Sequence, residues 1–80
     1  MLTTEEIANR IRAAIPDAQV TVRDPMSDGR HFEATVVSAS FKGLSRVAQH
    51  QAVYAPLKDL IGTDALHALS LKTAAPYVHL

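Results

Sequence analysis

The first hydrophobic pattern of the chain repeats at the spacing of an amphipathic helix. Its apolar stripe consists of Ile7, Ile11, Ala14 and Ile15. Thr3 and Glu6 have the spacing of a capping box, in which two side chains satisfy backbone amides at a helix start. Pro16 disfavours the helical conformation of the residue before it, so the helix is predicted to end there.

Two patterns of alternating apolar and polar residues follow, and they predict two strands that each bury one face. The apolar positions are Ala18, Val20 and Val22 in the first pattern and Phe32, Ala34 and Val36 in the second. The second strand is predicted over residues 31 to about 39, with His31, Glu33 and Thr35 on its opposite face. Residues 24–30 contain an Asp-Pro and an Asp-Gly pair, which favour turns, so the two strands are expected to form a hairpin.

A second helical pattern covers residues 44–61. Its broad apolar face consists of Val47, Val53, Tyr54, Leu57, Leu60 and Ile61. Pro56 lies inside this pattern, and a proline has no amide hydrogen and clashes with the preceding turn. We therefore expect a kink near Tyr54 and Ala55, or two abutting helices, with Gly62 as the C-terminal cap.

A third strand is predicted over residues 66–72, and Pro76 indicates a loose tail. The order of elements is thus helix, strand, strand, kinked helix, strand. Helices on one face of a three-stranded sheet form a two-layer α+β sandwich. With 80 residues, the chain is expected to form a single domain over residues 1–80.

The size and motif content of the chain argue against an enzyme. Eighty residues leave no room for a deep active-site cleft. The sequence also has no phosphate-binding loop, no dinucleotide-binding glycine motif, no zinc-protease motif and no nucleophile elbow. We therefore expect a binding protein that is not an enzyme.

The net charge of the chain argues against nucleic-acid binding as its main function. Eight basic and eight acidic residues give a net charge of zero, whereas nucleic-acid binders usually carry a basic excess. No acid lies between Glu33 and Asp59. The cations in this gap are Lys42, Arg46 and Lys58. They form either a basic face or an ordinary solvated surface.

Cysteine usage and hydropathy bear on cellular location. The chain has no cysteine, which excludes disulfides, a thiolate nucleophile and a cysteine metal site. Its first residues are acidic where a secretory signal would be basic and then apolar, and no apolar run approaches the length of a membrane span. We expect a cytoplasmic protein with no membrane partner.

Histidine is the best remaining metal ligand, because imidazole binds borderline metals and no cysteine is present. The histidines are His31, His50, His67 and His79. His31 begins the predicted second strand and His67 begins the third. If these strands are parallel neighbours, both histidines lie at the same end of the sheet and could share a metal site. Their separation in the sequence matches no metal-binding motif.

Each histidine also has a structural interpretation. His67 could lie at the edge of the core with one ring nitrogen hydrogen-bonded to the backbone. His50 lies on the apolar face of its helix, which favours a packed and hydrogen-bonded side chain, and His79 is expected to be solvated. Phe41 and Tyr54 are expected in the core rather than as exposed stacking platforms for RNA bases.

Four ordered motifs resemble the BolA family. They are D-G-R-H-F-E at residues 28–33, S-x-x-F-K-G at 38–43, S-R-V-A-Q-H-Q-A-V-Y-A-P-L at 45–57 and H-A-L-S-L-K-T at 67–73. The resemblance covers nearly the whole chain and points to the short bacterial BolA-like branch. It implies a fold related to class II KH domains, in agreement with the predicted order of elements.

The resemblance also implies a partner and a cofactor. BolA-like proteins pair with monothiol glutaredoxins, and the heterodimer holds a 2Fe-2S cluster in iron–sulfur trafficking or in iron and redox sensing. The residues that match the family's ligands are His67 and His31, while the glutaredoxin supplies its own cysteine and that of bound glutathione. The isolated chain is not expected to hold the cluster, and when free it is expected to be a monomer or a weak dimer.

Two alternatives remain open. The KH-like fold and family roles in transcription point to a nucleic-acid-binding regulator of stress or morphology genes. KH domains grip the backbone through a G-x-x-G loop, whereas residues 41–46 read F-K-G-L-S-R and contain one glycine. The other alternative is an adaptor that docks glutaredoxin without metal.

Overall fold

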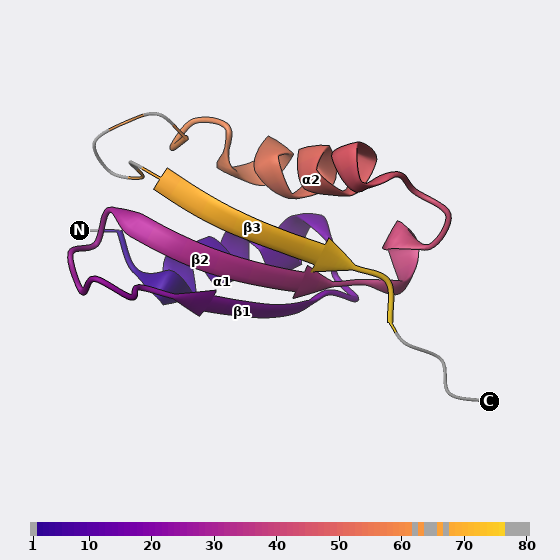
Figure 1. Ribbon diagram of the computed structural model, residues 1–80, viewed down its shortest axis with the longest axis horizontal. Coiled ribbons are helices and arrows are strands. Elements are labelled where there is room, and N and C mark those ends of the chain that lie inside the picture. Colours follow the sequence, from indigo (N-terminus) through magenta and orange to yellow (C-terminus); the bar gives the residue numbers. More distant parts are fainter. Residues whose placement is uncertain (1, 62, 64–65, 67, 77–80) are drawn as a thin grey trace.

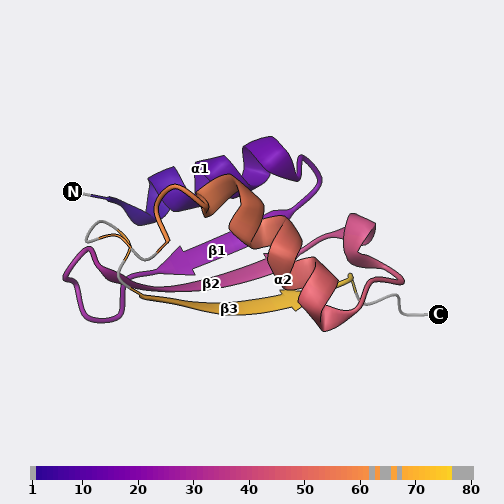
Figure 2. The same ribbon diagram turned by 90° about the horizontal axis from the view of Figure 1, so that it is seen from above.

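The structure is a computed structural model that describes residues 2–61, 63, 66 and 68–76. Its helices and strands, in chain order, are α1 (Thr4–Ala14), β1 (Gln19–Arg23), β2 (His31–Val37), the 3-10 helix η1 (Ala39–Phe41), α2 (Arg46–Tyr54), the 3-10 helix η2 (Ala55–Leu57) and β3 (Ala68–Ala74). Both α-helices cover the same face of a three-stranded sheet (Figure 1 and Figure 2). The predicted two-layer α+β fold is therefore confirmed.

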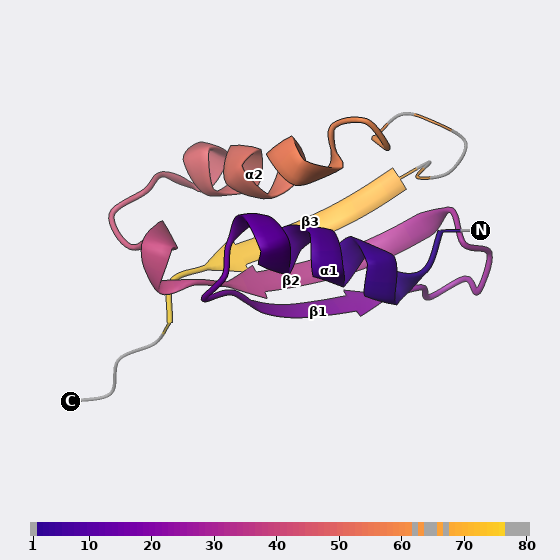
Figure 3. The same ribbon diagram turned by 180° about the vertical axis from the view of Figure 1, so that it is seen from behind.

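The capping signal at the start of the chain forms α1 as predicted. The Thr3 hydroxyl accepts a hydrogen bond from the Glu6 amide at 3.1 Å and donates to the Glu6 carboxylate at 3.4 Å. Ile7 and Ile11 are fully buried where α1 crosses the face of the sheet (Figure 3). The prediction that Ala14 joins this buried stripe is wrong. Ala14 is exposed because it is the last helical residue, where the chain turns toward β1.

β1 and β2 form the predicted antiparallel hairpin, in which Val20 pairs with Val36. The buried face of β2 consists of Phe32, Ala34 and Val36, as the alternating pattern predicts. β2 ends at Val37, earlier than the predicted end near Ala39. The reason is that Ser38 caps η1, so the chain bends there instead of extending the ladder.

The bend at the end of β2 is held by Asp17. The buried Ser38 hydroxyl donates to the Asp17 carboxylate at 2.8 Å and accepts from the Ser40 amide at 3.1 Å. The Ala39 amide donates to the same carboxylate at 2.9 Å. These hydrogen bonds, led by the one from Ser38, lower the pKa of Asp17 below its ordinary value. The carboxylate thus ties the α1–β1 connection to the point where β2 gives way to η1.

α2 begins at Arg46 and not at the predicted Leu44, because Ser45 supplies the helix cap. The Ser45 hydroxyl accepts a hydrogen bond from the Ala48 amide at 3.1 Å. Gly43 precedes it with a positive φ of 83°, a conformation that glycine adopts without a steric penalty. The turn at Gly43 therefore directs the chain toward α2, and Ser45 caps the first turn of that helix.

The predicted break in the second helix is confirmed. α2 ends at Tyr54, and Ala55 begins η2, a single 3-10 turn that contains Pro56. A proline cannot donate to the helical hydrogen-bond ladder, so the α-helix stops about two turns before the predicted end at Ile61. The prediction that the helix continues to Ile61 is wrong.

The face of α2 that packs on the sheet is narrower than predicted. Val53 and Leu57 are fully buried, whereas Val47 is 67% exposed and Ile61 is 40% exposed. Tyr54 is half-buried and is not the core residue that the pattern predicts. The reason is that α2 crosses the sheet obliquely and its first turn projects past the edge strand β3 (Figure 2), so only one stripe of the helix meets another element.

β3 runs parallel to β2 and completes the sheet in the order β1-β2-β3. It begins at Ala68 and ends at Ala74, later at both ends than the predicted residues 66–72. Leu66 is buried but lies outside the strand, where it forms an isolated bridge with Ile61. The parallel pairing on which a shared histidine site depends is present.

An apolar core fills the space between the helices and the sheet. Its buried members are Ile7, Ile11, Ile15, Phe32, Val36, Phe41, Val53, Leu57 and Leu66. The core position predicted for Phe41 is thus confirmed. The predicted cap at Gly62 lies outside the described residues, as do residues 77–80 of the tail predicted at Pro76. Within the described part of the chain, no helix is long and apolar enough to cross a membrane.

Val53 and Val47 offer a matched test of this packing, because both are valines on α2 and only Val53 is buried. Val53→Ala should lower the free energy of unfolding by about 2 kcal/mol, since it removes buried methyl groups and leaves a cavity. Val47→Ala should change it by less than about 0.5 kcal/mol. The change in helix propensity is the same at both sites and cancels in the comparison. Urea unfolding followed by circular dichroism measures both, and equal effects would contradict the packing of α2.

Candidate functional site

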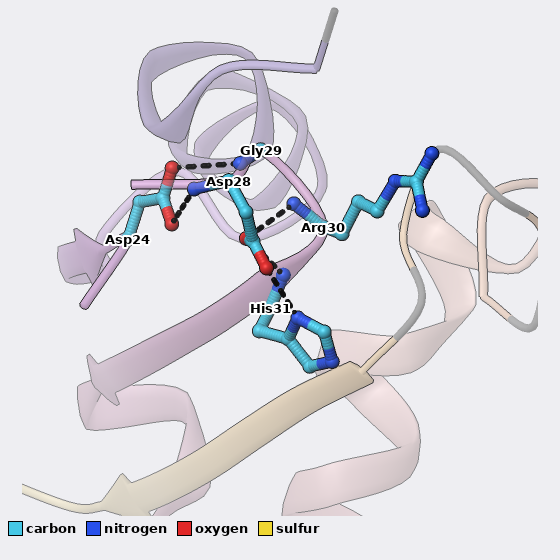
Figure 4. Close-up of polar contacts among 5 residues, drawn as sticks. All are labelled: Asp24, Asp28, Gly29, Arg30 and His31. Atoms are coloured by element: carbon cyan, nitrogen blue, oxygen red, sulfur yellow. Dashed lines mark hydrogen bonds and ion pairs between the residues drawn. The ribbon is translucent and has the colours of Figure 1, made fainter. Parts of the chain in front are cut away.

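The loop of residues 24–30 is organised by the side chain of Asp24. Its carboxylate accepts hydrogen bonds from the Asp28 amide at 3.2 Å and from the Gly29 amide at 2.9 Å (Figure 4). Gly29 has a positive φ of 68°, which glycine tolerates and most other residues do not. These contacts curl the loop back on itself and carry Asp28 to the start of β2.

Asp28 then caps the beginning of β2. Its Oδ1 accepts hydrogen bonds from the amides of Arg30 at 2.9 Å and His31 at 3.1 Å, and its Oδ2 lies 2.6 Å from Nδ1 of the His31 ring (Figure 4). The Arg30 amide, followed by the His31 ring and amide, holds the pKa of Asp28 well below its usual range. At neutral pH an ionised carboxylate therefore lies beside the imidazole.

The contact with Asp28 determines which nitrogen of the His31 ring carries the proton. An ionised carboxylate only accepts hydrogen bonds, so Nδ1 donates, and in the neutral imidazole Nε2 carries the lone pair. Metal-binding histidines usually have their second ring nitrogen bonded to a carboxylate or a carbonyl in this way. The His31 side chain is 40% exposed, so a ligand or a partner protein can reach the ring.

His31 lies at the end of the sheet where β3 begins. It pairs with Ala68, and the Ala68 amide donates a hydrogen bond to the Arg30 carbonyl at 3.1 Å. Figure 4 shows the His31 ring beside the start of the β3 ribbon. His67 precedes Ala68 in the sequence but lies outside the described residues, so its role as a ligand stays a prediction.

The described residues supply only part of a metal site. Among them, no three His, Cys, Asp or Glu side chains are grouped so that they could hold a metal ion. His31 fits the donor chemistry of an iron ligand, because imidazole suits iron and the Asp28 contact at Nδ1 makes Nε2 the nitrogen that carries the lone pair. A complete ligand set would have to draw on residues outside the described part or on a partner protein.

His50 takes a different position from the packed one that its helix pattern predicts. It is half-buried on α2, and its ring meets the Tyr54 ring edge-on, with centroids 6.1 Å apart and planes at 88°. His50 lies beside the last residues of β3, at the opposite end of that strand from Ala68. The structure therefore does not bring His50 together with His31. His79 lies outside the described residues.

Asp28 is the residue of the candidate site that the sequence interpretation missed. It stands in the D-G-R-H motif, which sequence reasoning used only to recognise a turn and a family. The signal that could have found it is an aspartate three residues before a histidine, because aspartates in turns accept hydrogen bonds from backbone amides two or three residues ahead. The same carboxylate then has a second oxygen available for the histidine ring.

Asp28→Asn tests how the loop is held. Removing the charge should lower the unfolding midpoint at pH 7, because the carboxylate accepts three contacts from Arg30 and His31. The folded-state pKa of Asp28 lies below its ordinary value of 3.8. Its stabilisation is therefore present above that pH and is lost as the pH falls through the folded-state value. The difference between wild type and Asp28→Asn should shrink in acid.

The ¹⁵N chemical shifts of the His31 ring provide the second measurement of the same variant. Wild type should show the tautomer protonated at Nδ1, and Asp28→Asn should show a mixture of tautomers. Glu33→Gln, which removes a carboxylate on the open face of β2, is the matched control and should change neither quantity. An unchanged tautomer in Asp28→Asn would contradict the assignment of the Nδ1 proton.

Comparison with known proteins gives a consistent set of relatives. The family profile described as BolA-like protein matches residues 4–77. The acid stress protein IbaG of Escherichia coli strain K12 is 43% identical over 49 residues, which are 61% of this chain and 58% of that protein. A BolA-like protein of Dictyostelium discoideum is 35% identical over 75 residues, which are 94% of this chain and 65% of that protein. The aligned residues thus span less than two thirds of either relative.

A solved structure has the same fold as the chain. The bolA protein homologue from Coxiella burnetii superimposes with a TM-score of 0.78 at 36% identity, covering 95% of this chain and 94% of that one. The two-layer fold, the matched family profile and the motifs around His31 agree with one another. The chain belongs to the BolA-like protein family.

Proposed function

We propose that this BolA-like protein pairs with a monothiol glutaredoxin and contributes imidazole ligands to a shared 2Fe-2S cluster, in iron–sulfur trafficking or in iron and redox sensing. The observation that carries the proposal is the 2.6 Å contact between Asp28 Oδ2 and Nδ1 of His31. It leaves the lone pair of the neutral ring on Nε2, which is the nitrogen that a metal would take.

His67 is the second proposed ligand. It is the residue before Ala68, and Ala68 pairs with His31 across the parallel strands, which supports a site at this end of the sheet. The remaining ligands are proposed to be thiolates, from the cysteine of the glutaredoxin and the cysteine of its bound glutathione. The chain itself has no cysteine and could contribute only imidazoles of this kind.

The residues of this chain present and hold the ligands. Asp28 keeps the proton on Nδ1 of His31, orients the ring and increases the basicity of Nε2. Asp24 restricts the loop through its bonds to the Asp28 and Gly29 amides, so less conformational freedom is lost when a partner binds. When bound, the cluster supplies a one-electron redox centre whose potential histidine ligation raises relative to all-thiolate ligation.

Ligation by histidine would make the shared site sensitive to acid. An imidazole binds metal only when it is neutral, so a proton on Nε2 of His31 competes directly with ligation. The Escherichia coli relative is named an acid stress protein. We propose that this competition connects the present chain to a stress response through loss of the shared cluster at low pH.

His31→Ala and His67→Ala test the two proposed ligands. Mixing the wild-type chain with a cluster-loaded monothiol glutaredoxin should change the visible circular dichroism of the cluster, because a ligand exchange alters its surroundings. Each of the two variants should weaken or abolish this change. His50→Ala is the matched control, since it removes an imidazole beside the other end of β3, and it should behave as wild type.

Iron and sulfide analysis of the co-purified pair separates this proposal from a metal-free adaptor. The wild-type pair should contain both elements, and a pair that forms without them would favour the adaptor. A visible spectrum that His67→Ala and His31→Ala leave unchanged would count against ligation by either histidine. A gel shift at physiological salt with a sequence preference would instead favour the nucleic-acid-binding alternative.

Asp28→Asn in the same assay measures how much the carboxylate contributes through His31. Losing the hydrogen-bond partner of a metal-ligating histidine typically lowers metal affinity by about 10-fold to 100-fold. We expect a loss in that range when the cluster of the mixed pair is titrated with an iron chelator. Glu33→Gln is again the control. If Asp28→Asn lost no more metal affinity than Glu33→Gln does, Asp28 would not act through His31.

A further inference from the structure

Two hollows lie between α2 and β3, and together they are called the α2–β3 groove. One hollow in it, of about 580 Å³, is lined by Gln51, Tyr54, Ala55, Lys58, Ile61 and Leu69. A second, of about 300 Å³, is lined by Arg46, His50, Leu71, Lys72 and Thr73. α2 crosses β3 obliquely (Figure 2), with the start of α2 toward the end of β3 (Figure 1), so the two hollows lie at different positions along β3.

The free edge of β3 borders this groove. β3 is the last strand of the sheet, and Figure 2 shows no further strand of the described chain beyond it. The Ala68 amide and the Ala74 carbonyl form their hydrogen bonds on the β2 side. Successive peptide groups of a strand alternate in direction, so the main-chain groups of Leu69, Leu71 and Thr73 point to the free edge. Such an edge is a template for another strand.

The α2–β3 groove carries positive charge. Arg46 and Lys58 are exposed, and each lines one of the two hollows. Of the described residues that line the groove, none is acidic. The ion pairs formed within the described part of the chain involve other residues. Cations beside an apolar hollow complement a ligand that has both acidic and apolar side chains.

The spacing of the charges sets the length of such a ligand. Arg46 and Lys58 are at most about 20 Å apart along the chain axis, since the α-helix rises about 1.5 Å per residue and the 3-10 turn after it about 2 Å. An extended chain covers that distance in roughly five or six residues. Between the two cations, Tyr54, Ile61 and Leu69 line the larger hollow, and Ile61 is 40% exposed.

We propose that the α2–β3 groove binds an extended acidic segment of a partner protein, which adds to β3 as a further strand. Two acidic side chains, roughly five or six residues apart, pair with Arg46 and Lys58. An apolar side chain between them occupies the hollow beside Tyr54 and Leu69. The main chain of the segment forms hydrogen bonds with the main-chain groups at the free edge of β3. The larger hollow and the two cations determine which sequences of the segment bind.

A peptide fits this edge better than a nucleic acid does. Donors and acceptors alternate along the edge of β3, and another strand matches both, whereas a phosphate backbone offers acceptors. The larger hollow is lined mainly by Tyr54, Ala55, Ile61 and Leu69, which complement an aliphatic side chain. The net charge of the chain is zero, which gives little general attraction for a polyanion.

The groove is separate from the proposed cluster site. The His31 side chain lies on the face of β2 opposite the buried residues Phe32 and Ala34, so it faces away from the helices. The groove lies on the helix side of β3, at the sheet edge. The two proposals therefore fail independently, and His31→Ala should leave peptide binding unchanged.

Fluorescence anisotropy with labelled peptides of about seven residues tests the proposal. The probe is Glu-Thr-Leu-Thr-Val-Thr-Glu. One control peptide has lysine in place of both glutamates, and another has two prolines in place of the central Thr-Val, which removes adjacent main-chain donors. A single-stranded thymidine oligonucleotide is the third control. We expect saturable binding of the acidic probe alone, weakened by salt. No binding of that probe, equal binding of either control peptide, or preference for the oligonucleotide would overturn the proposal.

Charge reversal locates the binding surface. Arg46→Glu and Lys58→Glu should each weaken binding of the acidic probe by about fivefold, because each converts an attraction into a repulsion. Arg12→Glu makes the same change in net charge on α1 and is the matched control. Thermal melts of all three variants verify that they fold. An equal loss in Arg12→Glu would show that binding follows net charge and not the groove.

Amide hydrogen exchange tests the addition of a strand. On binding the acidic probe, the amides of Leu69, Leu71 and Thr73 should exchange more slowly, because they point to the free edge. The amides of Ser70 and Lys72 point to β2 and should change little. Protection that does not alternate in this way, or no protection at all, would contradict pairing with β3.

Discussion

The parallel pairing of β2 with β3 is the constraint on which the rest of the molecule depends. Parallel neighbours cannot be joined by a tight turn, so the chain between Val37 and Ala68 has to cross the sheet, and η1, α2 and η2 make that crossing. The same pairing brings the start of β3 beside the loop that ends at His31. It also leaves the other edge of β3 without a strand in the described chain. The candidate site and the groove are both consequences of this one pairing.

Two aspartates hold the ends of the central strand. Asp17 accepts hydrogen bonds from Ser38 where β2 ends, and Asp28 accepts them from His31 where β2 begins. Both carboxyl groups have pKa values below the ordinary value of 3.8, so their contributions to stability are present above that pH and are lost in stronger acid. The strand that carries the candidate ligand is thus fixed at both ends by groups that remain ionised at neutral pH.

Sequence patterns predicted the fold where the signal is local. The capping pair at Thr3 and the helix break at Pro56 depend on a few neighbouring residues, and both are present in the structure. The prediction that Val47 belongs to the buried face was wrong. Burial of a helix residue depends on whether another element packs against it, and the first turn of α2 lies at the edge of the sheet (Figure 2). Sequence reasoning found the strand-start histidines, and the family resemblance selected among them. It missed Asp28 because the contact requires a loop conformation that Asp24 sets through space.

An open strand edge is a hazard, since it can pair with the edge of another copy. Arg46 and Lys58 in the α2–β3 groove reduce the risk of such pairing between two copies. If two copies paired edge to edge, each would bring its own cations against those of the other, and the like charges would oppose self-association. The same cations favour an acidic strand, so one set of charges both rejects the wrong partner and selects the right one. Because His31 faces away from the groove, a segment bound along β3 and a partner bound at the end of the sheet could be held by the same chain at once.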